Sequence, residues 1–141
     1  LLIDGDLRHP GIEGFIQPPS NRGLAQHLAS PEENVGQFVN HDVIPNLSVL
    51  YAGGVSPDAQ ELLSSAAFEV TLGQCLRDYD ATIVDTPPAN ICADVQLISR
   101  ILGYSLVVAR QNRSRVSDLR TLTAQLESDR VNVIGTVLSE G

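Results

Sequence analysis

The chain has 141 residues, enough for one domain with a substantial buried core. Apolar residues make up 43% of it and charged residues 18%, which excludes a disordered or collagen-like chain. No apolar run approaches the roughly 20 residues of a membrane span. The formal net charge of -8 argues against a nucleic-acid-binding module, so we expect no nucleic-acid partner.

The residue types that are present and absent lead to further expectations about the chain. All basic residues are Arg, and the chain contains neither Lys nor Met. Residues 1–4 read as the middle of a buried strand, so we expect the chain to be part of a longer protein. Cys75 and Cys92 lack the spacing of a metal site, and we expect both to be buried thiols in a reducing cytoplasm. The histidines are scattered, and we expect all three to be surface or loop residues: His9, His27 and His41.

Short apolar runs predict the strands. They are continuous and rich in Val, Ile and Leu, as in strands that are covered on both faces of a parallel sheet. The predicted strands are residues 1–4, 47–52, 82–85, 106–109 and 133–138.

The segments between these runs suit helices, with an irregular loop over residues 11–22. The predicted helices are residues 23–29, 60–77 (as one helix or two), 94–102 and 117–129. Asp58 is a candidate N-cap and Gly103 a candidate stop. The alternation of strands and helices predicts an α/β fold with a doubly wound, mainly parallel sheet between helix layers, in one domain over residues 1–141.

Acidic residues stand at the ends of two predicted strands, where open α/β sheets bind ligands. Asp4 and Asp6 follow the first strand and share one face, about 6–7 Å apart, if the chain is extended there. Asp85 ends the third strand and could complete the group. Carboxylates gathered at one sheet edge predict Mg²⁺ shared with phosphate oxygens, with Arg8 as a phosphate or carboxylate partner. The alternative is that each Asp only caps its own turn.

A second candidate site follows the fourth predicted strand. Arg110, Arg113 and Arg115 lie within six residues and could face a nucleotide or an acidic surface. The alternative is a solvated loop in which Ser114 or Ser117 caps the next helix.

These residues resemble a known family. Residues 1–10 resemble the Walker A′ motif, and residues 83–88 the Walker B motif, of the bacterial tyrosine kinases of capsule and exopolysaccharide synthesis. Residues 45–50 and 53–65 resemble the stretch between the motifs. Residues 108–116 resemble the branch that accompanies polysaccharide chain-length-determinant proteins. The resemblance covers nearly the whole chain in the right order and implies a Min-like P-loop NTPase fold.

The resemblance also implies roles for the acidic residues. Asp4 and Asp6 match the aspartates that serve Mg²⁺ and activate the attacking tyrosine hydroxyl, and Arg8 matches the motif arginine. Asp85 matches the aspartate that holds Mg²⁺ and its waters. The implied reaction is transfer of the γ-phosphoryl group of ATP to tyrosine.

Nucleotide contacts and partners follow from the same resemblance. Ser139 stands where the family usually has an Asn that contacts adenine, and Arg110 and Asn112 are further candidates for nucleotide binding. The implied partners are a membrane polysaccharide co-polymerase, other copies of the kinase in a ring, and a tyrosine-bearing protein substrate. The implied location is the cytoplasmic face of the bacterial membrane.

The chain also departs from the family pattern. It lacks the GxxxxGK[ST] loop, and without Lys it cannot reach the β- and γ-phosphates in the usual way. We expect that loop upstream of Leu1 in the parent protein, and we expect this chain alone to be inactive. The alternatives are a Min- or partitioning-type ATPase switch, a non-catalytic module that docks on a co-polymerase, and a phosphatase of the haloacid-dehalogenase type.

Overall fold

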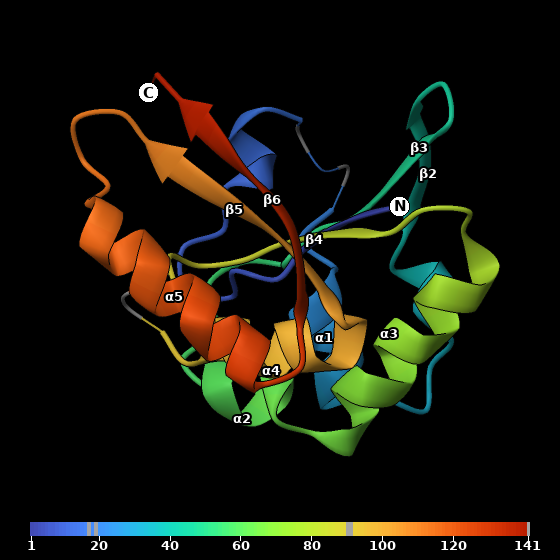
Figure 1. Ribbon diagram of the computed structural model, residues 1–141. Helices are drawn as coiled ribbons and strands as arrows, with labels where there is room; N and C mark the ends of the chain where they lie inside the picture. Colours follow the sequence, from blue (N-terminus) through green and yellow to red (C-terminus); the bar gives the residue numbers. More distant parts are fainter. Residues whose placement is uncertain (17, 19, 90–91, 141) are drawn as a thin grey trace. The chain divides into compact units, whose positions relative to one another are not determined.

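The computed structural model describes residues 1–16, 18, 20–89 and 92–140. They form two compact units, Leu1–Pro87 and Pro88–Gly141 (Figure 1). Each unit has its own sheet, with four strands in the first and two in the second.

The sheet of the first unit has the order β2-β3-β1-β4. The buried strand β1 (Leu2–Asp4) pairs in parallel with β3 (Leu47–Leu50) on one side and with β4 (Ile83–Asp85) on the other. An antiparallel strand, β2 (Asn40–Ile44), pairs with β3 at the edge. The parallel pairing of β1 and β4 places their carboxyl ends next to each other, which positions the candidate site.

Helices and short turns of helix complete the first unit. They are η1 (Ile12–Gly14), α1 (Leu24–Ala29), η2 (Val35–Gln37), α2 (Ala59–Leu63) and α3 (Ala66–Asp78). Fully buried apolar side chains form the core of the unit, and they include Ile3, Leu24, Leu50, Leu63 and Phe68.

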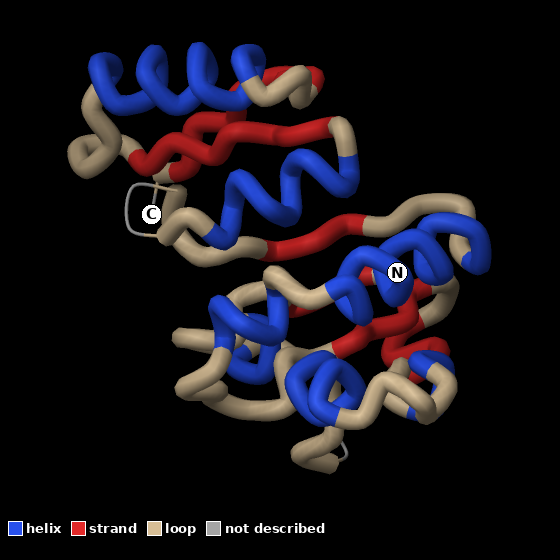
Figure 2. The backbone as a smooth tube through the Cα atoms, turned by 90° about the horizontal axis from the view of Figure 1, so that it is seen from below, coloured by secondary structure: helices blue, strands red, loops and turns tan. Residues whose placement is uncertain are grey.

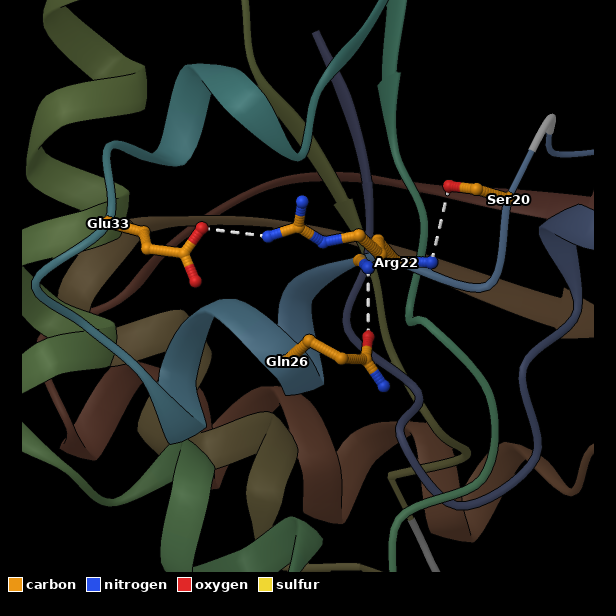
Figure 3. A network of polar contacts seen from close by, with 5 residues as sticks. Ser20, Arg22, Gln26 and Glu33 are labelled. Atoms are coloured by element: carbon orange, nitrogen blue, oxygen red, sulfur yellow. Dashed lines mark hydrogen bonds and ion pairs between the residues drawn. The ribbon is translucent and has the colours of Figure 1, made fainter.

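The start of α1 is fastened to the end of β3. The backbone N–H of Leu24 donates to the Tyr51 carbonyl at 2.8 Å. The Gln26 side chain accepts from the Gly23 N–H at 2.9 Å (Figure 3). It also donates to the Gly53 carbonyl at 2.8 Å. These bonds satisfy N–H groups that a helix start otherwise leaves without partners. The chain between β1 and α1 is therefore held at both ends.

Arg22 lies just before the start of α1 and contacts both an acidic side chain and an aromatic ring. The Arg22 side chain reaches Glu33 at 2.8 Å, as Figure 3 shows, and its guanidinium lies 4.5 Å from the ring centre of Phe38. Phe38 in turn contacts the imidazole of His27, with ring centres 5.2 Å apart. His27 is 4% exposed, so the prediction that it is a surface or loop residue is wrong.

The second unit contains α4 (Asp94–Leu102), β5 (Tyr104–Arg110), α5 (Val116–Ser128) and β6 (Asn132–Ser139). Strands β5 and β6 pair in parallel. Helix α5 lies along them (Figure 2), and Leu126 packs with Val107 and Val131 in a small core. Gly103 ends α4 with a φ of 74°, as the sequence predicts.

Every predicted strand and helix is present, with small shifts at the ends, and the segment over residues 60–77 forms two helices. The strand β2 was not predicted. Asp58 precedes α2 but makes no capping bond with its side chain, whereas Ser65 caps α3. Cys75 is buried as expected, but Cys92 is only half-buried. Within the described ranges, no helix is both long and apolar enough to cross a membrane.

Candidate active site

Asp4 is the last residue of β1 and is fully buried. Its Oδ1 accepts from the backbone N–H of Asp6 at 3.1 Å, and its Oδ2 accepts from the N–H groups of Gly11 and Ile12 at 3.2 Å each. Burial raises the pKa of Asp4, and these N–H groups oppose the rise. The carboxylate therefore organises the whole loop that follows β1.

Asp6 lies on that loop, two residues further on. Its Oδ1 accepts from the backbone N–H groups of Arg8 at 3.1 Å and His9 at 2.9 Å, and the residue is 7% exposed. The loop is also tied to the segment between β3 and α2, because the Ser56 N–H donates to the Leu7 carbonyl at 2.8 Å. Asp6 and Arg8 are thus presented from a loop with fixed ends.

Asp85 ends β4 and lies directly opposite Asp4 in the parallel register. Its backbone carbonyl accepts from the Gly5 N–H at 2.9 Å. Partial burial raises the pKa of Asp85, the Thr86 N–H lowers it, and the charge of Asp6 raises it again. The charge of Asp85 also raises the pKa of Asp4. Asp85 is therefore close enough to both Asp4 and Asp6 to interact with them through charge.

Repelling carboxylates at a strand edge suit a cation, and the donor set limits which kind. In the part of the chain that the structure describes, no three His, Cys, Asp or Glu side chains are grouped so that they could hold a metal ion by themselves. Mg²⁺ needs only one or two carboxylates when waters and phosphate oxygens complete its shell. Asp85, which is partly open to solvent, and Asp6 fit that requirement better than the fully buried Asp4.

The second set of predicted residues lies together in the second unit. Arg110 pairs with Ser139 in the parallel register of β5 and β6, and the Gln111 N–H donates to the Ser139 carbonyl at 2.8 Å. Asn112 follows in a left-handed conformation, with a φ of 60°. Arg110, Asn112 and Ser139 are thus brought to one turn at the carboxyl ends of two parallel strands.

Two structural features of these sites were not visible in the sequence. The N–H groups that hold Asp4 belong to Gly11 and Ile12, in a stretch predicted only as irregular loop. Neither Ser114 nor Ser117 caps α5, since the Ser114 hydroxyl accepts from the Arg110 N–H and the Ser117 hydroxyl donates to Asp118. The alternative in which one of these serines caps α5 is therefore wrong, because the Ser114 hydroxyl folds back onto the end of β5.

Known proteins similar to this chain share one activity by name. No family model matches the chain. The tyrosine-protein kinase Ptk of Acinetobacter johnsonii is 31% identical over 140 residues, and the tyrosine-protein kinase Etk of Escherichia coli K12 is 30% identical over 139 residues. Each match covers 99% of this chain and 19% of the relative. CapB of Staphylococcus aureus is 30% identical over 140 residues, and the chain spans 61% of its length.

Solved structures agree with this result. The kinase domain of Escherichia coli Etk has a TM-score of 0.89 at 29% identity, with 98% of this chain and 54% of that domain covered. The chimerical protein CapA2B2 has a TM-score of 0.85 at 28% identity, with 97% of this chain and 60% of that chain covered. The cell division ATPase MinD of Pyrococcus furiosus, at 21% identity and a TM-score of 0.77 over 97% of this chain, shares the fold.

The predicted fold class is confirmed by these structures. By name, the relatives are kinases and an ATPase. Both activities use a nucleotide and generally a divalent metal. The chain is homologous over its whole length to part of the kinase domains of the bacterial tyrosine kinases.

Proposed function

We propose that the protein to which this chain belongs is an ATP-dependent protein-tyrosine kinase of the P-loop type, acting in capsule or exopolysaccharide synthesis. One observation carries the proposal: Asp4 and Asp85 face each other across parallel strands, with Asp6 on the following loop, in a chain homologous to tyrosine kinases. The chain spans only part of those relatives, so the activity belongs to the longer protein.

The positions of Asp4, Asp6 and Asp85 support a different role for each carboxylate. Asp6 and Asp85 would hold Mg²⁺, which when bound neutralises phosphate charge. Asp6 also accepts the proton of the tyrosine hydroxyl, since it lies on the loop at the open end of the strands. Arg8 offers a guanidinium to phosphate oxygens. Asp4 anchors the loop that carries Asp6 and Arg8, because its own oxygens are used by backbone N–H groups.

The turn after β5 supports a nucleotide contact. Arg110, Asn112 and Ser139 offer a charged fork and neutral polar groups at the carboxyl ends of β5 and β6, the usual end for ligands in such folds. We assign the neutral pair to the base or sugar and Arg110 to a phosphate.

Partners and location extend the same proposal. A membrane polysaccharide co-polymerase would switch the kinase on at the cytoplasmic face of the membrane, and copies of the kinase would assemble in a ring around a tyrosine-bearing substrate. The resemblance of residues 108–116 to the branch that accompanies polysaccharide chain-length-determinant proteins supports the first of these partners.

The test compares this chain with the longer protein encoded by the same gene. Both are incubated with radiolabelled ATP, Mg²⁺ and a tyrosine-bearing peptide, and phosphotyrosine is measured. We expect transfer by the longer protein and none by the 141-residue chain, which lacks Lys and a Gly-rich loop.

Variants of the longer protein sharpen the result. Asp6→Asn and Asp85→Asn should each abolish transfer, whereas Asp80→Asn, at an exposed position just before β4, should retain it. ATP hydrolysis without phosphotyrosine would point to a nucleotide switch instead. Metal-dependent transfer by the chain alone would overturn the expected inactivity.

A further inference from the structure

The side chain of Tyr51 is fully buried, and its hydroxyl has no hydrogen-bond partner among the described residues. Tyr51 directly follows β3 and lies in one apolar cluster with Val49 of that strand and Ile12 of η1. Burial raises the pKa of Tyr51, and the charge of Glu13, also in η1, raises it further. The short helix η1 therefore lies against a polar group whose hydrogen bonds it does not provide.

A buried hydroxyl without a partner favours any arrangement in which water can reach it. Leaving the group unpaired costs free energy, and hydration removes that cost. The other two tyrosines of the chain differ in this respect, since Tyr104 is exposed and the Tyr79 hydroxyl lies 3.5 Å from His41 Nδ1. The Tyr51 hydroxyl thus opposes the packing of η1 above it.

The segment that carries η1 is held mainly through Asp4. Its Oδ2 accepts from the N–H groups of Gly11 and Ile12 at 3.2 Å each, the long end of the range for such bonds. Phe15, directly after η1, is 91% exposed, so its side chain does little to hold the segment in place. Movement of η1 away from β3 would need the loss of these two bonds and of the contacts of Ile12.

Such a movement would not disturb the loop that carries Asp6. That loop is fixed through the other oxygen of Asp4, since Oδ1 accepts from the Asp6 N–H at 3.1 Å. It is also fixed by the bond from the Ser56 N–H to the Leu7 carbonyl. The two oxygens of Asp4 therefore hold two separate segments, and only the one on Oδ2 lies over the Tyr51 side chain.

We propose that residues 11–15 form a cover over Asp4 with a closed and an open position, and that the closed position is autoinhibitory. The Tyr51 hydroxyl shifts the balance toward the open position, in which water reaches it. Opening releases Oδ2 of Asp4, the residue opposite Asp85 in the parallel register. The freed oxygen then faces the cation that we assign to Asp6 and Asp85, so this part of the inference rests on the proposed function.

The test measures amide hydrogen exchange in the longer protein by mass spectrometry of its peptides. The amides of Gly11 and Ile12 should exchange faster than those of the buried strand β3, because they open without unfolding of the sheet. Tyr51→Phe removes only the hydroxyl and should slow exchange at both amides about tenfold. Tyr104→Phe removes a hydroxyl from an exposed side chain and should leave the exchange unchanged.

Transfer to a tyrosine-bearing peptide and urea unfolding are measured on the same variants. Tyr51→Phe should lower the transfer rate about tenfold, because the fraction of open protein falls by that factor. Its urea midpoint should stay the same or rise, since the buried group without a partner is gone. Lower activity without lower stability separates control of the cover from a purely structural role of Tyr51.

Three results would overturn the cover. They are exchange at Gly11 and Ile12 as slow as in β3, unchanged exchange in Tyr51→Phe, and a lower urea midpoint for Tyr51→Phe, which would mean that the hydroxyl has a partner. Slower exchange with unchanged transfer would show that the closed position is not autoinhibitory. Because exchange needs no catalysis, slower exchange in a protein that transfers no phosphate would contradict the kinase proposal and leave the cover intact.

Discussion

The carboxylate of Asp4 accepts a hydrogen bond from the backbone N–H of Ile12, eight residues further along the chain, at 3.2 Å. The bond closes the loop after β1 on the strand from which it starts. Since Gly11 donates to the same oxygen and Asp6 to the other, both oxygens of this fully buried group are used inside the protein. Asp4 therefore links the acidic strand edge to the fold itself.

Replacing Asp4 by Asn should destabilise the protein even though the shape is kept. The amide has only one acceptor oxygen, so its NH₂ group must face at least one backbone N–H, either that of Asp6 or those of Gly11 and Ile12. A buried donor without a partner costs about 1–3 kcal/mol. Urea unfolding followed by circular dichroism measures the loss. Unchanged stability of Asp4→Asn would show that the loop does not depend on this carboxylate.

Gly23 should tolerate no side chain. A Cβ at this position would lie 2.3 Å from the Tyr51 carbonyl oxygen and 2.6 Å from the Gly53 nitrogen, where α1 is fastened to the end of β3. Because both contacts are backbone, we expect Gly23→Ala to lower the free energy of unfolding by about 1–3 kcal/mol.

Gly14→Ala is the matched control for this close approach. A Cβ at Gly14 meets nothing within 4 Å, so the change should alter stability by no more than about 1 kcal/mol. Thermal unfolding of both variants checks the pair. Equal midpoints for the two variants would argue against a tight contact at Gly23.

The elements that the sequence predicts well are those whose signal is local. The strand over residues 82–85 is a short apolar run that ends in Asp85 before two prolines, and the structure places it within one residue. β2 was missed because its residues, Asn40 to Ile44, are mostly polar, and because Asp42 has a φ of 49° within an irregular antiparallel pair. An edge strand of this kind lacks the continuous apolar pattern of a parallel sheet.

In the candidate site, too, the features with a local sequence signal were predicted and those that depend on distant residues were not. Strand-end positions predicted that Asp4 and Asp85 would lie together, and the parallel register puts them opposite each other. The sequence could not show that Gly11 and Ile12 would close over Asp4, since that depends on the path of an irregular loop. Likewise, the burial of His27 depends on a partner 44 residues away, Thr71, which no local pattern connects with it.

The ionised carboxylate of Asp85 should lower the free energy of unfolding of the isolated chain at neutral pH. Its pKa is raised in the folded protein, so the ionised form is favoured more strongly in the unfolded chain. Asp85→Asn should therefore raise the urea midpoint at pH 7. The gain should vanish below the ordinary Asp pKa of 3.8, where the carboxyl is protonated in both states.

The control for this effect is Asp80→Asn, which changes an exposed Asp just before β4. We expect it to leave the midpoint unchanged at both pH values. A lower midpoint for Asp85→Asn at pH 7 would show that the ionised carboxylate stabilises the strand end instead of straining it.

His27 should make the first unit sensitive to mild acid. The Thr71 hydroxyl donates to the Ala67 carbonyl at 2.7 Å, so it accepts from His27 Nε2 at 2.9 Å, and the proton of the neutral ring is on Nε2. Nδ1 is buried and has no partner among the described residues. Burial lowers the pKa of His27 below 6.5, although Glu33 partly opposes this. The unfolded chain therefore binds the proton more readily than the folded one.

The sign of the pH dependence follows from that difference. The contribution of His27 to the free energy of unfolding is complete above pH 6.5 and is lost as the pH falls toward the lowered pKa. Over that range the free energy of unfolding should fall by at most about 1.4 kcal/mol per pH unit. Urea unfolding between pH 5 and pH 8 should show this slope. His27→Phe should remove it, because Phe cannot titrate, whereas His9→Gln at an exposed position should retain it. A slope that survives in His27→Phe would place the acid-sensitive group elsewhere in the chain.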